Sequence, residues 1–448
     1  MREVLPLLVF TVIIPLQMHF LLSIAISILS FGAVADNEKA NNAPMINQAI
    51  TACAERGGGK VIVPEGTFTT GTIYLKDNVM LVLEKGSVLK GSTDLANYSS
   101  LHTSLDLSRY ESGEGTANFN SATDPQWSKA LIFATGVHHA GIEGDGCIDG
   151  NNVRNPFGEE RMRGPHTILL AGCRDMIFRD FTTSNSANYA FLAYQTKNIS
   201  FRNLKINGGW DGIHIRGGKN IDISHCQLHT GDDAIAGGYW RDALIQDCII
   251  NSSCNGIRMI MPSRNVKIED CSFEGPGIHP HHTSGRTETE TAINIQPGGW
   301  GKAPGRLDNI RISRCRMNNL LCPVSVTLSD DNSAGTIIID DLQAKNIKHM
   351  ALSVKSWGKA VIDKVVIRRS HIEFVGKDDP ALPQWFEGKP FSEWPVFPCW
   401  GIYFRNVKKI DTDKVTLTLR GNDYRQPVIF DGSELRGDGF HVTRDGSE

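Results

Sequence analysis

The sequence contains no Cys-x-x-Cys pair, although ten of its 448 residues are cysteines. Cysteine-based zinc sites depend on such closely spaced pairs, so we expect no zinc site. A basic excess is missing as well: 46 lysines and arginines face 49 aspartates and glutamates, for a net charge of -3 at pH 7. Nothing in this balance indicates a nucleic-acid partner. An acidic polymer would bind only through a cleft that is locally basic.

The N-terminus carries a long apolar run. Arg2 precedes the run, which extends from Val4 to about Ile28. A positive residue followed by such a run is typical of a signal peptide, and an uncleaved anchor is the alternative. We therefore expect residues 1–28 to direct export, so that the protein is secreted or periplasmic.

The central part of the sequence repeats every 22 residues. The first apolar runs of four successive units begin at Tyr189, Asp211, Asp233 and Asn255. Each unit holds two further short runs that alternate apolar and polar residues and end in Gly, Asn or Asp, which is the pattern of strands joined by turns. A propeller blade or a tetratricopeptide repeat would need a period of about 34 to 50 residues. The repeat therefore predicts an all-β fold, a right-handed parallel β-helix with three short strands in each coil.

The repeat becomes weaker outside the central part. Weaker coils continue to about Thr443, with insertions at 92–127, 275–290 and 376–398. No linker separates these coils. We therefore expect a single elongated domain over residues 29–448.

Helical periodicity is almost absent, with one exception near the N-terminus. Pro44 suits the first turn of a helix, and Gly57–Gly59 would end it. The apolar residues between them have the spacing of one amphipathic helix: Met45, Ile46, Ala49, Ile50 and Cys53. We expect this helix to cap the open end of the coil stack, which would otherwise expose a strand edge.

The cysteines follow the repeat. Export permits disulfides, but Cys226, Cys248 and Cys271 lie 22 and 23 residues apart, so the repeat stacks them in successive coils. We interpret them as buried free thiols that fill a ladder, and not as a disulfide framework.

Three aspartates also recur at the repeat distance. Residues one coil apart lie in neighbouring parallel strands, about 4.8 Å apart. Asp211 and Asp233 are therefore expected to stack, with Asp232 beside Asp233 and Asn255 on the next coil. Carboxylates this close raise the pKa of at least one of them, which leaves a protonated acid beside ionised bases. Glycoside hydrolysis needs that division, and a solvated acidic turn or a calcium site is the alternative.

At these motifs the sequence resembles family 28 of the glycoside hydrolases, the polygalacturonases and rhamnogalacturonases. The resemblance covers about residues 30–345. Trp210-Asp211-Gly212-Ile213 corresponds to the family's Asn-Thr-Asp-Gly motif, and Gly231-Asp232-Asp233 to its Gly-Asp-Asp motif. By this resemblance Asp232 would be the general acid. Asp211 and Asp233 would hold and activate the water, which implies inversion at the anomeric carbon.

Two departures from the family pattern concern the substrate. The family's Gly-His-Gly motif falls on Cys254-Asn255-Gly256, so an asparagine replaces the histidine. The family's Arg-Ile-Lys motif, which grips the galacturonate carboxylate, best matches Asn294-Ile295-Gln296. An amide cannot replace a bidentate guanidinium–carboxylate contact. Either other side chains supply the charge, or the sugar at the cleavage point is neutral.

Several other side chains are candidates for binding substrate. Arg258 is expected in the same wall column as His214, two coils away, and His214 could take the place of the missing histidine. Arg286 lies in the inserted loop 275–290, whose histidines we interpret as a polar rim and not as a metal site. Trp210 could stack on a sugar, or it could be a buried aromatic at the edge of a coil. The predicted substrate-binding set, including the residues at the departures, is Arg258, His214, Asn255, Trp210, Asn294, Gln296 and Arg286.

These features predict a glycoside hydrolase that cleaves O-glycosidic bonds in a pectin-type or related polysaccharide or oligosaccharide. The expected partner is a carbohydrate, and we expect no cofactor, no metal, no membrane contact beyond the export signal, and a monomer. One alternative is a lyase acting on a uronate polymer, with Arg258 near Asp211 and Asp233 as its base. The other is a glycan-binding β-helix without catalysis, which the loss of the family's histidine, arginine and lysine favours.

Overall fold

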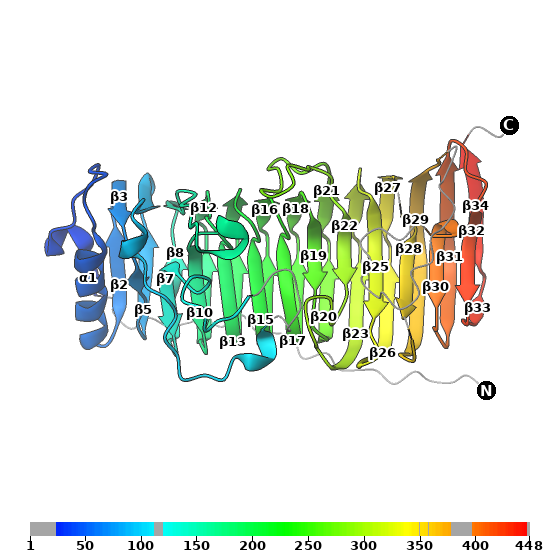
Figure 1. Cartoon of the computed structure of the whole chain (residues 1–448), viewed down its shortest axis with the longest axis horizontal. Helices are drawn as coiled ribbons and strands as arrows, with labels where there is room; N and C mark the ends of the chain where they lie inside the picture. The colour runs from blue at the N-terminus through cyan, green and yellow to red at the C-terminus, as the bar shows by residue number, and fades with distance from the viewer. Residues whose placement is uncertain (1–23, 112–119, 349, 357, 378–396, 446–448) are drawn as a thin grey trace.

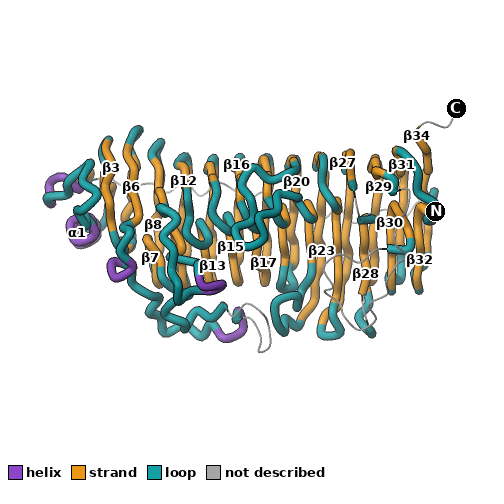
Figure 2. Tube along the Cα trace, turned by 45° about the horizontal axis from the view of Figure 1, so that its top comes forward, coloured by secondary structure: helices purple, strands orange, loops and turns teal. Residues whose placement is uncertain are grey.

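The computed structural model describes residues 24–111, 120–348, 350–356, 358–377 and 397–445. Its 34 strands form one elongated stack in which strands stand side by side along the long axis (Figure 1). Figure 2 shows them as a continuous row, with loops and short helices outside it. The named strands pair in parallel with strands of the neighbouring coils, as the 22-residue repeat predicts. The fold is the parallel β-helix expected from the sequence.

Strand pairing divides the stack into three walls. Wall 1 contains β4 (Ile73–Tyr74), β7 (Ala130–Thr135), β10 (His166–Ala171), the first halves of β13 (Phe191–Arg202), β15 (Ile213–Ser224) and β17 (Ile235–Gln246), then β19 (Asn255–Met259), β22 (Thr291–Ile295), β25 (Cys322–Leu328), β28 (Leu352–Ser356), β30 (Cys399–Arg405) and β32 (Gln426–Asp431).

Wall 2 contains β1 (Ala25–Ser27), β2 (Gly59–Val63), β5 (Val79–Leu83), β8 (His138–Glu143), β11 (Arg174–Arg179), the second halves of β13, β15 and β17, then β20 (Arg264–Glu269), β23 (Gly305–Ser313), β26 (Asn332–Asp340), the first halves of β29 (Ile362–Val375) and β31 (Ile410–Arg420), and β33 (Leu435–Gly437).

Wall 3 contains β3 (Gly66–Thr70), β6 (Ser87–Gly91), β9 (Cys147–Asp149), β12 (Thr182–Ser184), β14 (Lys205–Asn207), β16 (Gln227–Thr230), β18 (Ile249–Ser252), β21 (Ser272–Glu274), β24 (Arg316–Asn318), β27 (Gln343–Ile347), the second halves of β29 and β31, and β34 (Phe440–Asp445). The helices are η1 (Ile28–Phe31), α1 (Ala43–Glu55), η2 (Leu95–Asn97), η3 (Ser108–Tyr110) and η4 (Glu159–Arg161).

The central coils differ from the prediction in one respect. The first two expected strands of a unit form one long strand, such as β15 with its 12 residues. The bend between the two halves is short: Gly217 in β15 has a φ of 81°, and Gln195 in β13 has a φ of 51°. A second left-handed residue follows three positions later, Asn198 in β13 and Asn220 in β15, and pairing with the neighbouring coils continues on both sides of the bend.

The helix predicted near the N-terminus is α1, and it packs on β1, β2, β4 and β5 at one end of the stack (Figure 1). Its apolar residues Ile46, Ala49, Ile50 and Cys53 are buried, as the periodicity predicts. β1 pairs with β2, so the fold includes residues before position 29, which the sequence indicated as its start. The predicted signal peptide lies outside the described residues apart from positions 24–28. None of the helices in the described ranges is long and apolar enough to span a membrane.

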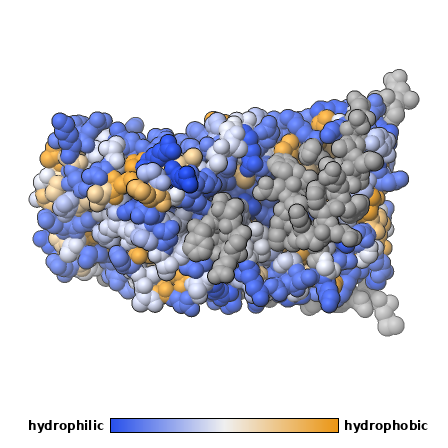
Figure 3. All heavy atoms as spheres, in the orientation of Figure 1, coloured by the Kyte–Doolittle hydropathy of each residue, from blue (hydrophilic) through white to orange (hydrophobic). Residues whose placement is uncertain are grey.

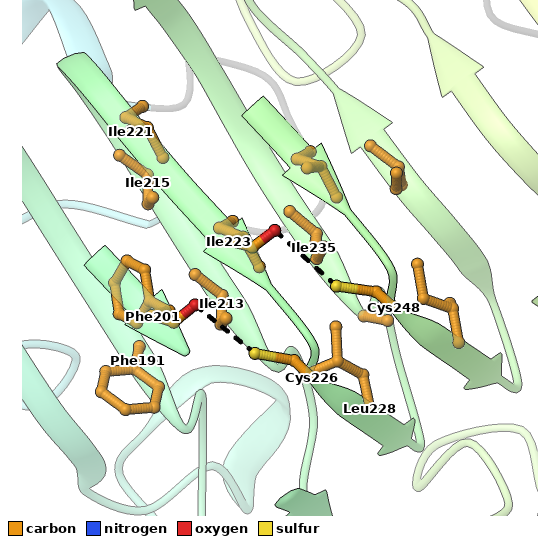
Figure 4. Close-up of a cluster of buried hydrophobic side chains, with 14 of the residues drawn as sticks. Phe191, Phe201, Ile213, Ile215, Ile221, Ile223, Cys226, Leu228, Ile235 and Cys248 are labelled. Atoms are coloured by element: carbon orange, nitrogen blue, oxygen red, sulfur yellow. Dashed lines mark hydrogen bonds between the residues drawn. The ribbon is translucent and has the colours of Figure 1, made fainter. Parts of the chain in front are cut away.

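The interior is a continuous column of apolar side chains. Phe191, Ile213, Ile235 and Ile257 occupy one register position in successive coils, and each is fully buried. Figure 4 shows several members of this column together with two of the thiols. Outside this core, the face of the molecule drawn in Figure 3 is mostly hydrophilic. The fold therefore buries its apolar residues inside the coils and leaves polar side chains to the walls.

The cysteines are free thiols, as the sequence predicts. All ten lack a disulfide partner. The Sγ atoms of Cys226, Cys248 and Cys271 donate to backbone carbonyls of the preceding coil at 3.6–3.8 Å. Hydrogen bonding between neighbouring thiols, together with burial, raises the pKa of Cys248 and Cys271. A thiol with a raised pKa carries little thiolate and reacts slowly.

A thiol titration tests this arrangement. We expect Ellman's reagent to modify at most Cys147 in the native protein, because this side chain is the one cysteine that is only partly buried. Unfolding in denaturant without reductant should expose all ten thiols. A smaller number in the unfolded chain would show that some of the cysteines form disulfides.

Candidate active site

The acidic residues form a column at the edge of wall 1. Asp211 and Asp233 lie shortly before β15 and β17, and Asn255 begins β19. The amide of Gly212 donates to the carbonyl of Asp233, and the amide of Ala234 donates to the carbonyl of Asn255, both at 3.0 Å. These bonds place the three residues in successive coils. The stacking predicted from the 22-residue spacing is therefore confirmed.

A cleft of about 560 Å³ lies over wall 1, and all three aspartates line it. The loops before β10, β22 and β23 complete its sides. Alternate residues of the wall 1 strands face the cleft, because successive side chains of a strand point to opposite faces. Residues from these strands that line the cleft include His214, Arg216, Ala236, Arg258, Asn294, Ser325, Thr327, Ser353 and Lys355.

Asp211 is held by a buried histidine. Its Oδ2 lies 2.6 Å from Nδ1 of His214. The other ring nitrogen, Nε2, accepts from Nε of Arg216 at 3.1 Å, so we assign the proton to Nδ1, which donates to Asp211. Burial, together with the charge of Arg216, holds the pKa of His214 well below its usual range. Tyr189 stacks on the imidazole at 4.8 Å. His214 therefore positions Asp211 as a neutral donor, and both of its nitrogens are engaged.

Asp233 accepts bonds on both oxygens. Its Oδ1 accepts from the backbone amide of Asn255 at 3.1 Å and from its Nδ2 at 2.8 Å. Its Oδ2 lies 3.3 Å from Nη1 of Arg258. Arg258 is the predicted cation of this wall column, and the register Ala236–Arg258 places it two coils from His214, as expected. The Asp233 carboxylate is thus fixed from two sides.

Asp232 makes the longest contacts of the three with cationic side chains, and its Oδ1 accepts from the backbone amide of Asp233 at 3.1 Å. Its Oδ2 lies 3.5 Å from Nη2 of Arg163 and 3.8 Å from Nε2 of His281. Its side chain is 12% exposed, against 4% for Asp211 and 6% for Asp233. Among the three carboxylates, Asp232 is the one most open to a group entering the cleft.

The surroundings of the three carboxyl groups shift their pKa values in different directions. Burial raises the pKa of Asp211 well above its usual range, and the charges of Asp232 and Asp233 add to this effect. Burial also raises the pKa of Asp233, against the opposing charge of Arg258. Burial acts in the same direction on Asp232, but the contacts with His281 and Arg163 outweigh it and lower its pKa. In the free protein Asp211 and Asp233 therefore hold a proton more readily than Asp232 does, whereas the resemblance assigns the acid role to Asp232.

The amides at the family's cationic positions contact the carboxylate column. Nδ2 of Asn294 donates to Oδ1 of Asn255 at 3.1 Å, and Asn255 in turn donates to Asp233. With its amide oriented to satisfy both groups, Gln296 accepts at Oε1 from Nη2 and Nε of Arg258, at 2.6 and 2.9 Å. Asn294 and Gln296 line the cleft, but Asn255 does not. The geometry gives Asn255, which was predicted to bind substrate, a positioning role: it lies behind Asp233 and donates twice to its Oδ1.

Trp210 and a second tryptophan, Trp300, differ in their position relative to the cleft. Trp210 is 3% exposed and does not line the cleft. The guanidinium of Arg163 covers its ring at 3.7 Å, and His282 stacks on it at 4.9 Å. The prediction that Trp210 stacks on a sugar does not fit this packing, and we assign it to the support of Arg163. Trp300 lines the cleft beside Arg258, whose guanidinium lies 5.0 Å from its ring.

The inserted loop 275–290 forms one rim of the cleft. Its histidines have different partners: His281 contacts Asp232 and Ser284, whereas His282 stacks on Trp210. The hydroxyl of Thr283 donates to Glu160 at 2.5 Å, which joins this loop to the loop before β10. The placement agrees with a polar rim.

Arg286 extends from this rim toward the base of the cleft. Its Nη1 pairs with Glu290 at 2.5 Å, and its Nη2 lies 3.2 Å from Sγ of Cys254. Asp232, Asp233 and Cys254 offer metal-ligand atoms within 4.8 Å of one another. The guanidiniums of Arg258 and Arg286 already contact two of these groups and would repel a cation, so the residues fit a metal poorly.

Two charged residues of the cleft carried no signal in the sequence. Glu159 lies in the loop before β10, and its Oε2 is 3.5 Å from Nε of Arg163. Burial raises the pKa of Glu159 to about 7. Lys355 lies in β28, in the weaker C-terminal coils. The 22-residue period does not extend to either position, so spacing alone could not place them in the cleft.

Comparison with known proteins supports the resemblance seen in the motifs. A family model described as "Right handed beta helix region" matches residues 166–319. An exopolygalacturonase of Arabidopsis thaliana is 21% identical, over 78% of this chain and 79% of its own length. An exo-poly-alpha-D-galacturonosidase of Dickeya chrysanthemi is 25% identical, over 70% of this chain and 58% of its own length. The chain is thus a divergent relative of the polygalacturonases.

A solved structure gives the same fold at greater distance. The family 28 exopolygalacturonase of Yersinia enterocolitica superposes with a TM-score of 0.54 at 15% sequence identity. The match covers 94% of this chain and 77% of that enzyme. A likeness at this identity establishes the β-helix architecture, and the assignment of chemistry to this chain depends on its own residues.

Proposed function

We propose that this divergent relative of the polygalacturonases is a glycoside hydrolase that cleaves O-glycosidic bonds in a pectin-type or related acidic glycan. One observation carries the proposal: Asp211, Asp232 and Asp233 converge on one cleft, and their environments push their pKa values in opposite directions. Pairs of titratable groups separated in this way are characteristic of acid–base catalysis.

The charge in the cleft favours an acidic substrate. Seven arginine or lysine side chains and seven aspartate or glutamate side chains line it. Burial raises the pKa of Asp211 well above its usual range and that of Glu159 to about 7, so not all of the acids are ionised at neutral pH. The cleft then carries a positive net charge, although the whole chain is slightly acidic. Cations from wall 1 and from the loops would supply the charge that Asn294 and Gln296 lack.

The chemistry requires one proton donor and one base. In the proposed reaction Asp232 donates its proton to the glycosidic oxygen, and the bond from this oxygen to the anomeric carbon breaks. A water molecule attacks the anomeric carbon and gives its proton to Asp233 or Asp211, so that the site regains one proton in total. Asp232 must take up a proton before each turnover. A bound uronate would favour this uptake, because a negative charge nearby raises the pKa of a carboxyl group.

The stereochemistry rests on the resemblance to inverting enzymes. The nearest oxygens of Asp232 and Asp233 lie within 4.8 Å, closer than the separation of about 6.5–9.5 Å that is typical of inverting pairs. Inversion is therefore expected from the resemblance and not from this separation, and the anomer of the first product tests it.

A substrate screen with product analysis tests the proposal. The purified protein is incubated with pectic and non-pectic oligosaccharides, and the anomer of the first product is read by NMR. We expect cleavage of an acidic glycan with inversion. Cleavage with retention would contradict the mechanism. A product with an ultraviolet-absorbing double bond, formed only with calcium, would identify a lyase instead.

We also propose that the protein acts outside the cytoplasm as a monomer. The predicted export signal and a polymeric substrate support this location. Gel filtration with light scattering, together with N-terminal sequencing of the exported protein, tests both statements.

A further inference from the structure

Lys355 lies in the same cleft as the carboxylates but far along the wall. It belongs to β28, and the strand register Thr327–Lys355 places it on the cleft side of wall 1. Its relative exposure is 3%. Lys355 thus lines the cleft although its side chain is almost fully buried. Such burial is unfavourable, because an isolated ammonium group is costly to remove from water.

The ammonium group has polar neighbours but no carboxylate partner. Nζ donates to Oγ of Ser353 at 2.9 Å and lies 3.4 Å from Oγ of Ser325. The ring of Phe397 covers it at 5.1 Å. Within the described ranges no aspartate or glutamate oxygen lies within 4.0 Å of Nζ, whereas Arg163, Arg258 and Arg286 each pair with one. Lys355 is thus a buried cation whose charge the described residues leave uncompensated.

Burial has the expected effect on this lysine. It lowers the pKa of Lys355 to about 8, because the neutral amine is easier to bury than the ammonium. The group is still mostly protonated at neutral pH. An anion that binds beside it would recover the cost of burial, so the position is prepared for a negative ligand.

The surrounding hydroxyls suit a carboxylate. Ser325 and Ser353 accept from Nζ, and their Oγ atoms lie 3.4 Å apart. Only one of these two hydroxyls can donate its hydrogen to the other, so the second hydroxyl hydrogen remains available to a ligand. Together with a free hydrogen on Nζ, it would meet the two oxygens of one carboxylate group.

The position of Lys355 along the stack shows that it and the aspartates would contact different sugar units. Arg258, Asn294, Ser325 and Ser353 occupy one register column, so Ser353 lies three coils beyond Arg258. Three strand spacings amount to about 14 Å, which is too far for one sugar ring to bridge. A group at Lys355 therefore belongs to a different sugar unit from the one at the aspartates.

We propose that Lys355, with Ser325 and Ser353, forms a distal subsite of the cleft that binds the carboxylate of a uronic acid unit several sugars away from the cleaved bond. This inference rests on the proposed function. It implies that the substrate is a chain of acidic sugars and that the cleft binds a second uronate of this chain away from the cleaved bond.

Binding to an inactive variant tests the subsite separately from catalysis. Asp232→Asn serves as the background, and the probe is an oligogalacturonate long enough to occupy the whole cleft, compared with its methyl ester. We expect Lys355→Met to weaken binding of the acid form about 10- to 100-fold, the range for a hydrogen bond to a charged group. Binding of the ester should not change. The matched control is Lys345→Met, an exposed lysine of β27 on wall 3, and it should affect neither ligand.

Two measurements keep the outcome clear. The melting temperature of Lys355→Met should be unchanged or higher, because the change removes a buried charge that no carboxylate of the described residues pairs with. After reductive ¹³C-methylation, the lysine resonance that is missing in Lys355→Met should move when the acid form is added. Equal affinity of Lys355→Met and Lys345→Met for the acid form overturns the subsite, and so does equal affinity of Asp232→Asn for the acid and the ester.

The subsite and the hydrolase proposal can fail independently. If the acid form binds through Lys355 but the wild-type protein does not cleave it, the subsite stands and the proposed hydrolysis fails. If the wild type hydrolyses acidic glycans while Lys355→Met binds them normally, the hydrolase stands and the subsite is wrong.

Discussion

Asp232→Asn is expected to lower kcat for glycan cleavage by about 10²- to 10⁴-fold, the contribution typical of a positioned general acid. An asparagine keeps the shape of the side chain but cannot supply a proton to the leaving oxygen. Folding should be retained, because Arg163, the cation beside Asp232, keeps its pairs with Glu159 and Glu160. The measurement is the initial rate on the glycan found in the screen, with the melting temperature as the folding control.

The leaving group separates the acid from the bases. On an aryl glycoside of the same sugar the leaving group departs without protonation, so Asp232→Asn should lose little activity. Asp233→Asn and Asp211→Asn should lose activity on both substrates, because the attacking water still needs a base. An equal loss for Asp232→Asn on both substrates would remove it from the acid role. The higher pKa of Asp211 and Asp233 in the free protein would then point to one of them as the donor.

The sequence was sufficient for the parts of the site that follow the repeat. A parallel β-helix converts a fixed spacing into a stack, so the 22 residues between Asp211 and Asp233 already determined that they are neighbours. The same rule placed Arg258 in the column of His214. Free thiols in a ladder followed from the same register.

Other parts depend on loops and on irregular coils. Trp210 has the right place in the sequence for a sugar platform, but Arg163 covers it from a loop that lies before β10, and no spacing indicates this contact. The sequence also does not show which residues share a register column in the coils after Asn294. Asn294 to Ser325 is a step of 31 residues and Ser325 to Ser353 a step of 28, because loops of different length separate the strands. Lys355 could therefore be assigned to the cleft only once the register was known.

Arg258→Met is expected to lower the free energy of unfolding substantially. Arg258 is the cation that contacts Asp233, at 3.3 Å, and the side chains of Arg258 and Asp233 are only 13% and 6% exposed. Removing one partner of a buried ion pair leaves the other charge uncompensated, which costs about 3–5 kcal/mol in the free energy of unfolding. The matched control is Arg314→Met, whose pair with Asp270 is exposed, and it should cost at most about 1 kcal/mol.

The pH dependence of the loss identifies its cause. The pKa of Asp233 is raised by burial and lowered by Arg258, so it should rise further in Arg258→Met. A carboxyl group with a raised pKa in the folded state contributes stability below its unfolded pKa of about 3.9 and loses it as the pH rises through the folded value. Urea unfolding of the variant should therefore show a small loss near pH 4 and the full loss at neutral pH.

The double variant Arg258→Met/Asp233→Asn completes the argument, because it removes both charges and leaves a neutral pair of similar volume. It should recover much of the stability that Arg258→Met loses at neutral pH. A loss in Arg258→Met that does not depend on pH and is not recovered in the double variant would show that Arg258 acts through its packing beside Trp300 and Gln296. Recovery would instead show that the charge of Arg258 allows a buried carboxylate to stay ionised in this wall, as a base in the cleft requires.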